Sequence, residues 1–317
     1  MSRNVCEELL EILREIGVRE IFGVTGDALN PFLDAIRYQD QVRWIGVRHE
    51  EAAAYAATAQ SQLTGRLGVC AGTVGPGALH LLNGLYNAKK EGAAVLAITG
   101  QVPRSEMGTG YFQEVNLSKV FDDVCIHQGV IDAPEQMPRV VELAIQNALS
   151  HQGVARIEIP SDVGPMAVPR GGVAHQIFSS DSEVVPRDDE LASAAEILDG
   201  AKKVTILSGS GCRGARDELV GLAEKLQAPI VHALKGADVV EYDHPHWVGL
   251  TGLIGTHAGY RAVEDCDALL MVGTDFPYRV FYPKNVPVIQ VDIRAEHLGK
   301  RCGVTHGLLG HARPVLA

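Results

Sequence analysis

A carboxylate at the start of an alanine-rich segment is the residue of this sequence best suited to proton chemistry. Glu50 follows Arg48 and His49 and precedes an alanine-rich run that extends to about Gln62. A glutamate in a dry pocket can hold or share a proton, as an acid–base step requires. A glutamate in the first turn of a helix is also common without a function, because it complements the helix dipole. These residues alone leave both interpretations open.

A glycine-rich loop is the second candidate. Residues 72–77 (GTVGPG) hold three glycines and a proline between a predicted strand and a predicted helix. Glycine lets the backbone approach a ligand closely. A plain turn between a strand and a helix is the alternative, but it needs only one or two such residues. We therefore predict that Gly75, Pro76 and Gly77 border a bound molecule.

A third candidate is the loop at residues 108–114 (GTGYFQE). Glycines followed by aromatic and amide side chains suit a substrate pocket. A loop that packs its aromatic side chains beneath itself would explain the same pattern. The residues leave these two interpretations open.

The second half of the chain holds motifs typical of nucleotide binding. Residues 209–214 (GSGCRG) have G-x-G-x-x-G spacing between a predicted strand and helix, which suits a dinucleotide diphosphate. The acid expected after the next strand is absent from residues 229–233, so an ordinary NAD site is not supported. Residues 251–255, residues 273–278 and Asp292 follow or end other predicted strands. Each alone is typical of a loop, but together they favour a nucleotide-binding domain.

These candidates need a parallel sheet whose strands end at one edge. Strands alternate with helices along the chain, and the strand at residues 93–98 is apolar throughout, as in a sheet covered on both faces. We predict an α/β fold of two tandem doubly wound parallel-sheet domains, the second Rossmann-like. The predicted strands are residues 20–24, 42–47, 67–71, 93–98, 155–159, 203–207, 229–232, 267–272 and 286–291. The longer predicted helices are residues 50–62, 78–90, 138–149, 188–198 and 215–226.

A change in composition divides the chain. Prolines and glycines are frequent and periodicity is weak at residues 161–187. Such a segment is typical of a linker that crosses a surface. We therefore predict a first domain at residues 1–160, a linker at residues 161–187 and a second domain at residues 188–317.

The composition is that of an ordinary globular protein. Apolar residues make up 46% and charged residues 21% of the 317 residues, and the formal net charge is −11. An acidic chain opposes nucleic-acid binding, and no apolar run reaches the roughly 18 residues of a membrane span. The six cysteines form no C-x-x-C pair, and the twelve histidines form no H-x-x-x-H pair. We expect reduced thiols, a cytoplasmic location and no metal site made by this chain alone.

Taken together, the motifs resemble the thiamine-diphosphate enzymes of the pyruvate oxidase and acetolactate synthase group. The likeness covers two of that family's three domains, the pyrimidine-binding domain and a central domain. Its first part rests on residues 23–27 (GVTGD), 48–51 (RHEE), 70–77 (CAGTVGPG) and 110–114 (GYFQE). Residues 251–255 (TGLIG) and 276–283 (FPYRVFYP) are most similar to the quinone-dependent pyruvate oxidases and imply a central domain that binds FAD.

The resemblance assigns roles to individual residues. In this family the glutamate at the position of Glu50 hydrogen-bonds N1′ of the aminopyrimidine, which readies the cofactor to attack the keto carbon of pyruvate. Glu51, one residue further along, is the alternative. By the same transfer, the pyrimidine is bordered by Gly75, Pro76 and Gly77. The residues implied to face the thiazolium and substrate are Val24, Phe112 and Gln113, the last also touching the cofactor. Those implied to line the flavin are Gly209, Gly211, Thr251, Gly252, Leu253, Ile254, Gly273, Thr274, Asp275, Phe276, Pro277 and Asp292.

The sequence also departs from the family pattern. The family's third domain holds magnesium and the cofactor diphosphate through a Gly-Asp-Gly motif, and that motif is absent here. His311 stands where the family usually has aspartate. We expect this chain to bind only the pyrimidine end of thiamine diphosphate and to be inactive without the third domain. It would be a fragment, a split subunit or a truncated relative.

Three functions follow as hypotheses. The first is the two-domain portion of a thiamine-diphosphate- and FAD-dependent pyruvate oxidase, which converts pyruvate to acetate or acetyl phosphate. The second is part of an acetolactate synthase-type carboligase. The third is a non-catalytic relative with a role in assembly or regulation. The resemblance also implies a homodimer or homotetramer, with no membrane contact from this chain.

Overall fold

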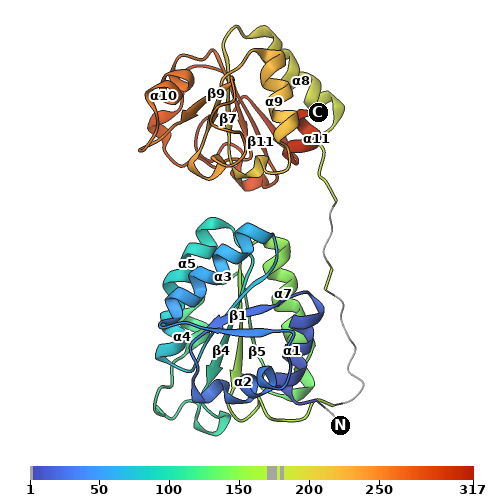
Figure 1. Cartoon of the computed structure of the whole chain (residues 1–317), viewed down its shortest axis with the longest axis vertical. Helices are drawn as coiled ribbons and strands as arrows, with labels where there is room; N and C mark the ends of the chain where they lie inside the picture. The colour runs from blue at the N-terminus through green and yellow to red at the C-terminus, as the bar shows by residue number, and fades with distance from the viewer. Residues whose placement is uncertain (1–2, 170–176, 179–181) are drawn as a thin grey trace. The chain divides into compact units, whose positions relative to one another are not determined.

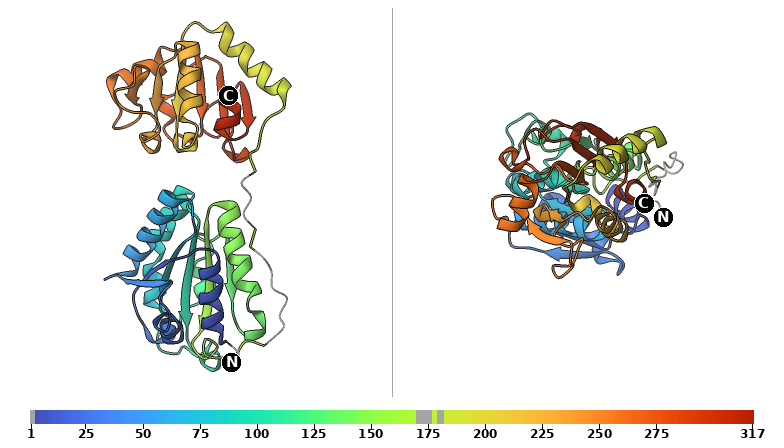
Figure 2. Two further views of the ribbon diagram at one scale, coloured as in Figure 1. Left: turned by 45° about the vertical axis from the view of Figure 1, so that its right-hand side comes forward. Right: turned by 90° about the horizontal axis from the view of Figure 1, so that it is seen from above.

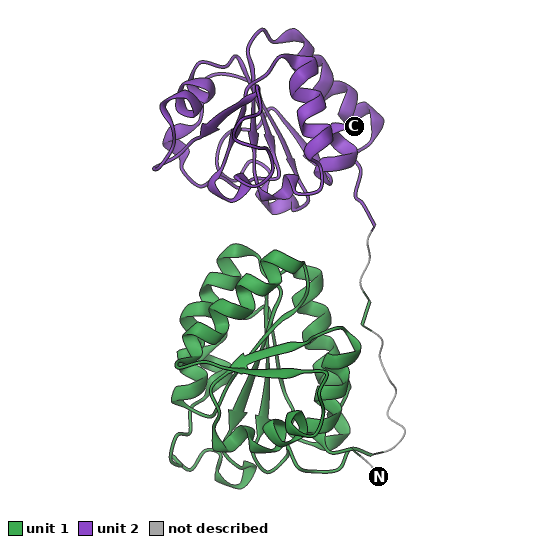
Figure 3. Cartoon of the chain, viewed as in Figure 1, with its two compact units in different colours: residues 1–180 green, residues 181–317 purple. Residues whose placement is uncertain are grey.

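The chain folds into two compact units of similar architecture. A computed structural model describes residues 3–169, 177–178 and 182–317. The first unit spans residues 1–180 and the second residues 181–317 (Figures 1 and 3). Each is a parallel sheet with helices packed on both faces, so the predicted fold class of two tandem doubly wound α/β domains is confirmed.

Unit 1 is built on a six-stranded parallel sheet. Its strands are β1 (Glu20–Gly23), β2 (Arg43–Gly46), β3 (Gly68–Gly72), β4 (Val95–Gln101), β5 (His127–Val130) and β6 (Val154–Pro160). They lie in the order β2-β1-β3-β4-β6-β5. The strand order reverses between β1 and β3, so the chain leaves these strands toward opposite faces. Open α/β sheets bind ligands at the carboxyl ends of strands at such a point.

The unit 1 helices form two layers. They are α1 (Val5–Glu15), α2 (Asn30–Arg37), α3 (Glu50–Thr64), α4 (Pro76–His80), α5 (Leu82–Glu91), α6 (Leu117–Val120) and α7 (Arg139–His151). Short 3-10 turns occur at η1 (Asp27–Leu29), η2 (Arg104–Glu106) and η3 (Pro134–Gln136). Side chains alternate along the strands, so Val69 and Ala71 pack with α1, α2 and α7, whereas Cys70 packs with α3, α4 and α5. Figures 1 and 2 show α7 on one side of this sheet and α3 and α5 on the other.

Unit 2 has a second six-stranded parallel sheet. Its strands are β7 (Val204–Ser208), β8 (Ile230–His232), β9 (Trp247–Leu250), β10 (Ala268–Val272), β11 (Val288–Asp292) and β12 (His306–Leu309). The order β12-β11-β10-β7-β8-β9 is that of the dinucleotide-binding Rossmann fold, with β7 and β10 at the switch point.

Helices also cover both faces of the unit 2 sheet. They are α8 (Asp188–Gly200), α9 (Arg216–Leu226), α10 (His257–Glu264) and α11 (Ala312–Leu316). Short 3-10 turns lie at η4 (Ser210–Cys212), η5 (Leu234–Gly236), η6 (Arg279–Phe281) and η7 (Ala295–His297). One core joins α8, α9 and α11 to the sheet, and the opposite core contains Val263 of α10 with Phe276 and Tyr282.

The segment predicted as a linker is partly anchored. Val163 is fully buried in unit 1, and the amide of Val168 donates to the carbonyl of Arg3. The amide of Val184 donates to Nδ1 of His311 in unit 2 at 2.8 Å. Residues 170–176 and 179–181 lie outside the described residues. The boundaries at residues 160 and 187 stay predictions.

The interior strands of both sheets were predicted from the sequence, whereas three edge strands were not. Strands β5, β9 and β12 were not predicted, and each lies at a sheet edge. The helix expected at residues 78–90 is two helices, because α4 already begins at Pro76 and α5 begins at Leu82. Among the described residues, the structure has no helix both long and apolar enough to cross a membrane.

Candidate functional site

Glu50 lies at the carboxyl edge of the unit 1 sheet. Strand β2 ends at Gly46, and α3 begins at Glu50 with His49 as its N-cap. Nδ1 of His49 accepts a hydrogen bond from the amide of Glu51 at 3.2 Å. Because α3 packs closely on β3, the Glu50 side chain turns inward and the residue is only 6% exposed. Glu51 turns away, and its carboxylate accepts a hydrogen bond from Asn83.

A histidine contacts the buried carboxylate. Nδ1 of His80, the last residue of α4, lies 2.9 Å from Oε2 of Glu50. The ring of His80 stacks on that of His49 with 4.4 Å between centroids. No other hydrogen bond to the Glu50 carboxylate forms within the described residues, so the His80 imidazole is its one polar partner there. Sequence reasoning missed His80.

The glycine loop places a residue without a side chain beside the other carboxylate oxygen. A Cβ on Gly77 would lie 3.1 Å from Oε1 of Glu50 and 2.7 Å from Cγ2 of Thr73. A Cβ on Gly26, which follows β1, would lie 2.5 Å from Cβ of Thr73. The Thr73 hydroxyl is buried and has no hydrogen-bond partner within the described residues. The structure thus gathers the loops after β1 and β3 around a carboxylate and an unpaired hydroxyl.

The third sequence candidate reaches the same place. Gly75 adopts φ of 60°, and a Cβ there would collide with the backbone carbonyl of Gln113. Gln113 itself has φ of 66°, which is uncommon for a residue with a side chain. Its neighbour Phe112 is 80% exposed, so this aromatic ring does not pack beneath its own loop. Val24 follows β1 at this edge and is half-buried, and Pro76 is exposed.

Glu114 fixes the conformation of that loop. Its carboxylate accepts hydrogen bonds from the amides of Gly108, Gly110 and Tyr111. The bond from Gly108, followed by those from the other two amides, lowers the pKa of the Glu114 carboxyl. The charged form is therefore retained at neutral pH and holds Phe112 and Gln113 in place.

A second buried carboxylate of unit 1 is held quite differently. Glu158 on β6 pairs with the guanidinium of Arg156, which is fully buried. Arg156 also donates to Thr99, Gln128 and Ser118 and lies over the ring of Phe121. This network satisfies every side of the arginine, as a buried charge requires. Glu158 is therefore structural, whereas Glu50 has no arginine or lysine partner in the part of the chain that the structure describes.

The unit 2 candidates also gather at a carboxyl edge. Gly252 has φ of 112°, and a Cβ there would lie 3.1 Å from the ring of Phe276. Thr251 is 3% exposed, and its hydroxyl has no hydrogen-bond partner within the described residues. Leu253 and Ile254 are 72% and 69% exposed, which is unusual for large aliphatic side chains. An orphaned hydroxyl beside exposed apolar side chains suits a partly apolar ligand.

The G-x-G-x-x-G loop is explained by packing between loops. A Cβ on Gly211 would lie 2.6 Å from Cα of Gly273, and one on Gly209 would lie 2.5 Å from Cβ of Thr274. The amide of Gly209 donates to Val272, and that of Gly211 donates to Gly273. These N–H groups are therefore not available to a phosphate. The adjoining helix α9 also carries Asp217 and Glu218 in its first turn, which opposes an anion there.

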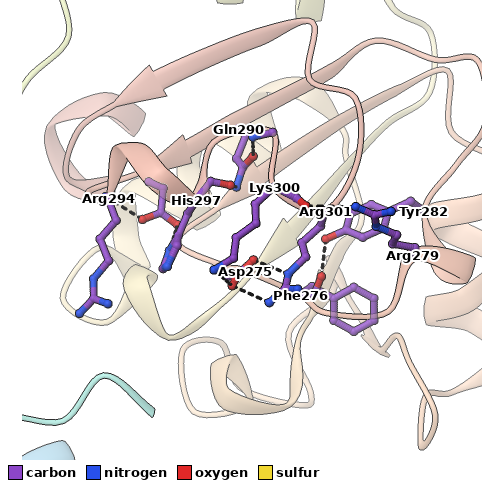
Figure 4. Close-up of polar contacts among 11 residues, drawn as sticks. Asp275, Phe276, Arg279, Tyr282, Gln290, Arg294, His297, Lys300 and Arg301 are labelled. Carbon is purple, nitrogen blue, oxygen red and sulfur yellow. Dashed lines mark hydrogen bonds and ion pairs between the residues drawn. The ribbon is translucent and has the colours of Figure 1, made fainter. Parts of the chain in front are cut away.

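Cationic side chains surround Asp275. Its carboxylate accepts from Nε and Nη2 of Arg301 at 2.7 and 2.9 Å and pairs with Nζ of Lys300 at 3.2 Å (Figure 4). Burial raises the pKa of the Asp275 carboxyl, but the hydrogen bonds and charges of Arg301 and Lys300 outweigh it and lower the pKa overall. The following Phe276 carbonyl accepts from the Tyr282 hydroxyl at 2.7 Å, and Pro277 is exposed.

Asp292 ends β11 beside this cluster. One carboxylate oxygen accepts the amide of Arg294 at 2.9 Å, and the other lies 3.3 Å from Nδ1 of His297. Gln290 fixes the same loop, since it accepts from the amide of Gly299 at 2.9 Å and donates to the carbonyl of His297 (Figure 4). Sequence reasoning found Asp275 and Asp292 but missed the cations, because Lys300 and Arg301 lie in a loop without a motif.

Two family models match most of this chain. Residues 3–120 match the family model described as the thiamine pyrophosphate enzyme N-terminal TPP binding domain. Residues 191–317 match the model of the thiamine pyrophosphate enzyme central domain.

Individual relatives match nearly the whole chain. An uncharacterized 42.6 kDa protein of Pseudomonas amyloderamosa is 46% identical over 98% of this chain and 78% of its own length. A putative thiamine pyrophosphate-containing protein of Bacillus subtilis is 41% identical over 97% of this chain and 54% of its own. Pyruvate oxidase of Lactiplantibacillus plantarum is 31% identical over 98% of this chain and 52% of its own. Acetolactate synthases match as well. The chain thus spans about half the length of the relatives named for an activity or cofactor.

Proposed function

Because this chain belongs to the thiamine pyrophosphate enzyme family, we propose that it supplies the pyrimidine-activating half of a thiamine diphosphate site in an enzyme that decarboxylates pyruvate or a similar 2-oxo acid. The observation that carries the proposal is the Glu50 carboxylate. It is buried, has one histidine as its partner, and lies beside a glycine where a side chain would otherwise stand.

The residues of unit 1 fit a flat aminopyrimidine ring. Glu50 would hold a proton at the ring nitrogen through Oε1, since Oε2 is already bonded to His80. Gly77 would let the ring lie against the backbone, and the unpaired Thr73 hydroxyl offers a further hydrogen bond. When bound, thiamine diphosphate supplies a carbon nucleophile and an electron sink for decarboxylation. Val24, Phe112 and Gln113 would then shape the space for the 2-oxo acid.

His80 would tune this step. An imidazole whose Nδ1 donates to Oε2 would orient the carboxylate, and the burial of Glu50 would limit the access of water to its proton. The His80 ring also stacks on the ring of His49. We propose that Mg²⁺ and the cofactor diphosphate are held by a part of the complete enzyme that this chain, which spans about half the length of such relatives, does not match. A homodimer or homotetramer of the complete enzyme belongs to the same proposal.

Binding of thiamine tests the role of Glu50 directly. Saturation-transfer NMR on the 317-residue chain should show transfer to the pyrimidine protons of thiamine. Glu50→Gln should weaken binding about tenfold or more, because a hydrogen bond to a charged group contributes about 1.5–3 kcal/mol. Gly77→Ala should abolish the transfer, because the alanine methyl group would fill the space beside Oε1 of Glu50.

Gly221→Ala is the matched control. Gly221 lies in α9, and a Cβ there meets nothing within 4 Å, so the same substitution should leave thiamine binding unchanged. Equal binding of thiamine by Glu50→Gln, Gly77→Ala and Gly221→Ala would contradict the proposal.

For unit 2 we propose FAD as the ligand and pyruvate oxidation as the overall reaction. The orphaned Thr251 hydroxyl, the exposed Leu253 and Ile254, and the Rossmann strand order support a partly apolar nucleotide there. The chain should retain FAD through gel filtration with a shifted flavin spectrum, and Thr251→Val should weaken that retention. If the unmodified chain loses all of its FAD during gel filtration, the proposal that unit 2 binds FAD is wrong.

An acetolactate synthase-type reaction is the second candidate, because several relatives carry that name. The two reactions can be separated by adding the part of the Bacillus subtilis relative that this chain does not match and supplying pyruvate. An oxidase should reduce an added quinone or dye. A carboligase should release acetolactate without any acceptor, and this outcome would replace the oxidase proposal.

A further inference from the structure

Three possible metal ligands converge at the Glu50 site. One ligand atom each from His49, Glu50 and His80 lies within 4.8 Å of the other two. Among the described residues, these three form the group of His, Cys, Asp or Glu side chains that could hold a metal ion. The group comes from two elements, the N-terminus of α3 and the C-terminus of α4. Sequence analysis gave no sign of it, because thirty residues separate Glu50 from His80.

The ligand types fit a first-row transition metal. Two neutral imidazoles and one carboxylate are the donor set of many zinc sites that keep a fourth position open. The carboxylate has no arginine or lysine partner within the described residues, so its charge is available to a cation. Hard cations such as Mg²⁺ prefer all-oxygen sites and are not matched.

The distances require only a small adjustment. Zinc bonds of about 2.0–2.2 Å place tetrahedral ligand atoms roughly 3.4 Å apart. Nδ1 of His80 and Oε2 of Glu50 are already 2.9 Å apart. The side chains of His49 and His80 are 50% and 47% exposed, so their rings can turn toward the carboxylate without disturbing the core. Coordination would replace the Glu50–His80 hydrogen bond, since one nitrogen cannot hold both a proton and a metal.

We propose that His49, Glu50 and His80 bind a divalent transition-metal ion, with Zn²⁺ the best match, and that this ion and an aminopyrimidine exclude each other. A metal on Glu50 would occupy the carboxylate that the ring nitrogen needs. A water molecule would complete the tetrahedron on the side that Gly77 leaves free. The site would thus make cofactor loading sensitive to free transition metal. The metal site itself does not depend on the proposed enzymatic function.

Cobalt spectroscopy on the complete chain tests the site. Co²⁺ should give the intense visible bands of four-coordinate cobalt at one ion per chain, and Zn²⁺ should displace it. His49→Ala, Glu50→Gln and His80→Ala should each weaken binding by at least tenfold, since even loss of a ligand's supporting partner costs about that much. Circular dichroism would verify that each variant is folded.

His244→Ala is the matched control. His244 and His246 form another histidine pair, with 5.9 Å between ring centroids, on unit 2. This variant should bind Co²⁺ like the unmodified chain. The proposal is wrong if His80→Ala retains affinity within twofold, if the spectrum stays that of six-coordinate cobalt, or if a sulfur-to-cobalt charge-transfer band assigns the ion to cysteine.

Competition separates this proposal from the proposed function. Saturating Zn²⁺ should abolish saturation transfer to thiamine, and the His80→Ala variant should be far less sensitive to Zn²⁺. Undiminished transfer in the presence of bound Zn²⁺ would disprove the mutual exclusion. If thiamine does not bind at all, the proposed function fails, yet the cobalt spectrum still decides whether the metal site exists.

Discussion

The two units share a parallel sheet with helices on both faces, but they hold polar groups at their carboxyl edges in opposite ways. In unit 1 the edge carboxylate, Glu50, is buried, and His80 is its one hydrogen-bond partner among the described residues. In unit 2 the edge carboxylate Asp275 is paired with Arg301 and Lys300, and the buried hydroxyl of Thr251 has no hydrogen-bond partner in the described ranges.

The difference shows how one architecture serves two tasks. A buried anion beside a titratable imidazole can exchange a proton, because neither partner has a fixed charge. An anion paired with arginine and lysine, such as Asp275, is not suited to exchange a proton. It instead fixes the positions of these cations, and neutral groups nearby can donate hydrogen bonds to a ligand. Unit 1 is therefore suited to chemistry and unit 2 to binding. Within unit 1, Glu158 with Arg156 shows that the same sheet can also bury a fully paired carboxylate.

Arg156 gives the largest expected effect. Arg156→Ala should lower the free energy of unfolding by about 3–5 kcal/mol, because it leaves Glu158 buried and uncompensated. Urea denaturation of the complete chain measures it. The double variant Arg156→Met, Glu158→Leu should recover most of the loss, since both charges are then removed together. A loss below 1 kcal/mol for the single variant would mean that unit 1 tolerates unpaired carboxylates generally, which would remove the distinction drawn for Glu50.

Removal of the Thr251 hydroxyl should have a smaller effect than loss of Arg156, and it should stabilise the chain rather than destabilise it. Thr251→Val should raise the free energy of unfolding by about 1–2 kcal/mol, because a buried hydroxyl without a partner costs stability and valine keeps its shape. Thr205→Val is the matched control, since Thr205 is equally buried but its hydroxyl donates to Ala262 at 2.7 Å. That control should lose about 1 kcal/mol. Thermal unfolding of both variants sharpens the comparison, and a destabilised Thr251→Val chain would show that the hydroxyl is satisfied without a ligand.

The smallest effect concerns Asp275 and pH. The folded-state pKa of this carboxyl is lowered, so its stabilisation is present above the unfolded value of about 4 and is lost as the pH falls through the folded value. Asp275→Asn should cost about 1 kcal/mol at pH 7, because the ion pair is partly exposed, and should flatten the acid limb of the stability curve. Denaturation at pH 7 and pH 3 measures both. An unchanged acid limb would show that Arg301 and Lys300 do not hold this edge.

The sequence predicted the interior of both sheets because apolar runs leave little choice there. Strand β4 is buried at every residue, and its apolar run alone identified it. Strands β5, β9 and β12 escaped prediction because an edge strand has one neighbour and need not be apolar. His306 and Leu309 of β12, for example, are not buried.

The candidate site divides in a similar way. Glu50, Gly77 and Gln113 follow local patterns and family motifs, and the structure brings all three to one edge. The contact of His80 with Glu50 could not be predicted, because it depends on where α4 begins and on how α3 packs beside it. Gly209 and Gly211 fit a phosphate-loop pattern, but in the structure their lack of side chains lets the loop at Gly273 pack closely against them.

Gly75 and Gln113 form a pair whose consequence extends to recombination between relatives. Both residues have positive φ, and the backbone of Gln113 occupies the space that a side chain at Gly75 would need. A crossover between residues 75 and 113 would separate two loops that contact each other, and a chimera with a side chain at position 75 would carry a clash with the backbone of residue 113. Chimeras made by recombining relatives should therefore exchange residues 72–114 as one block.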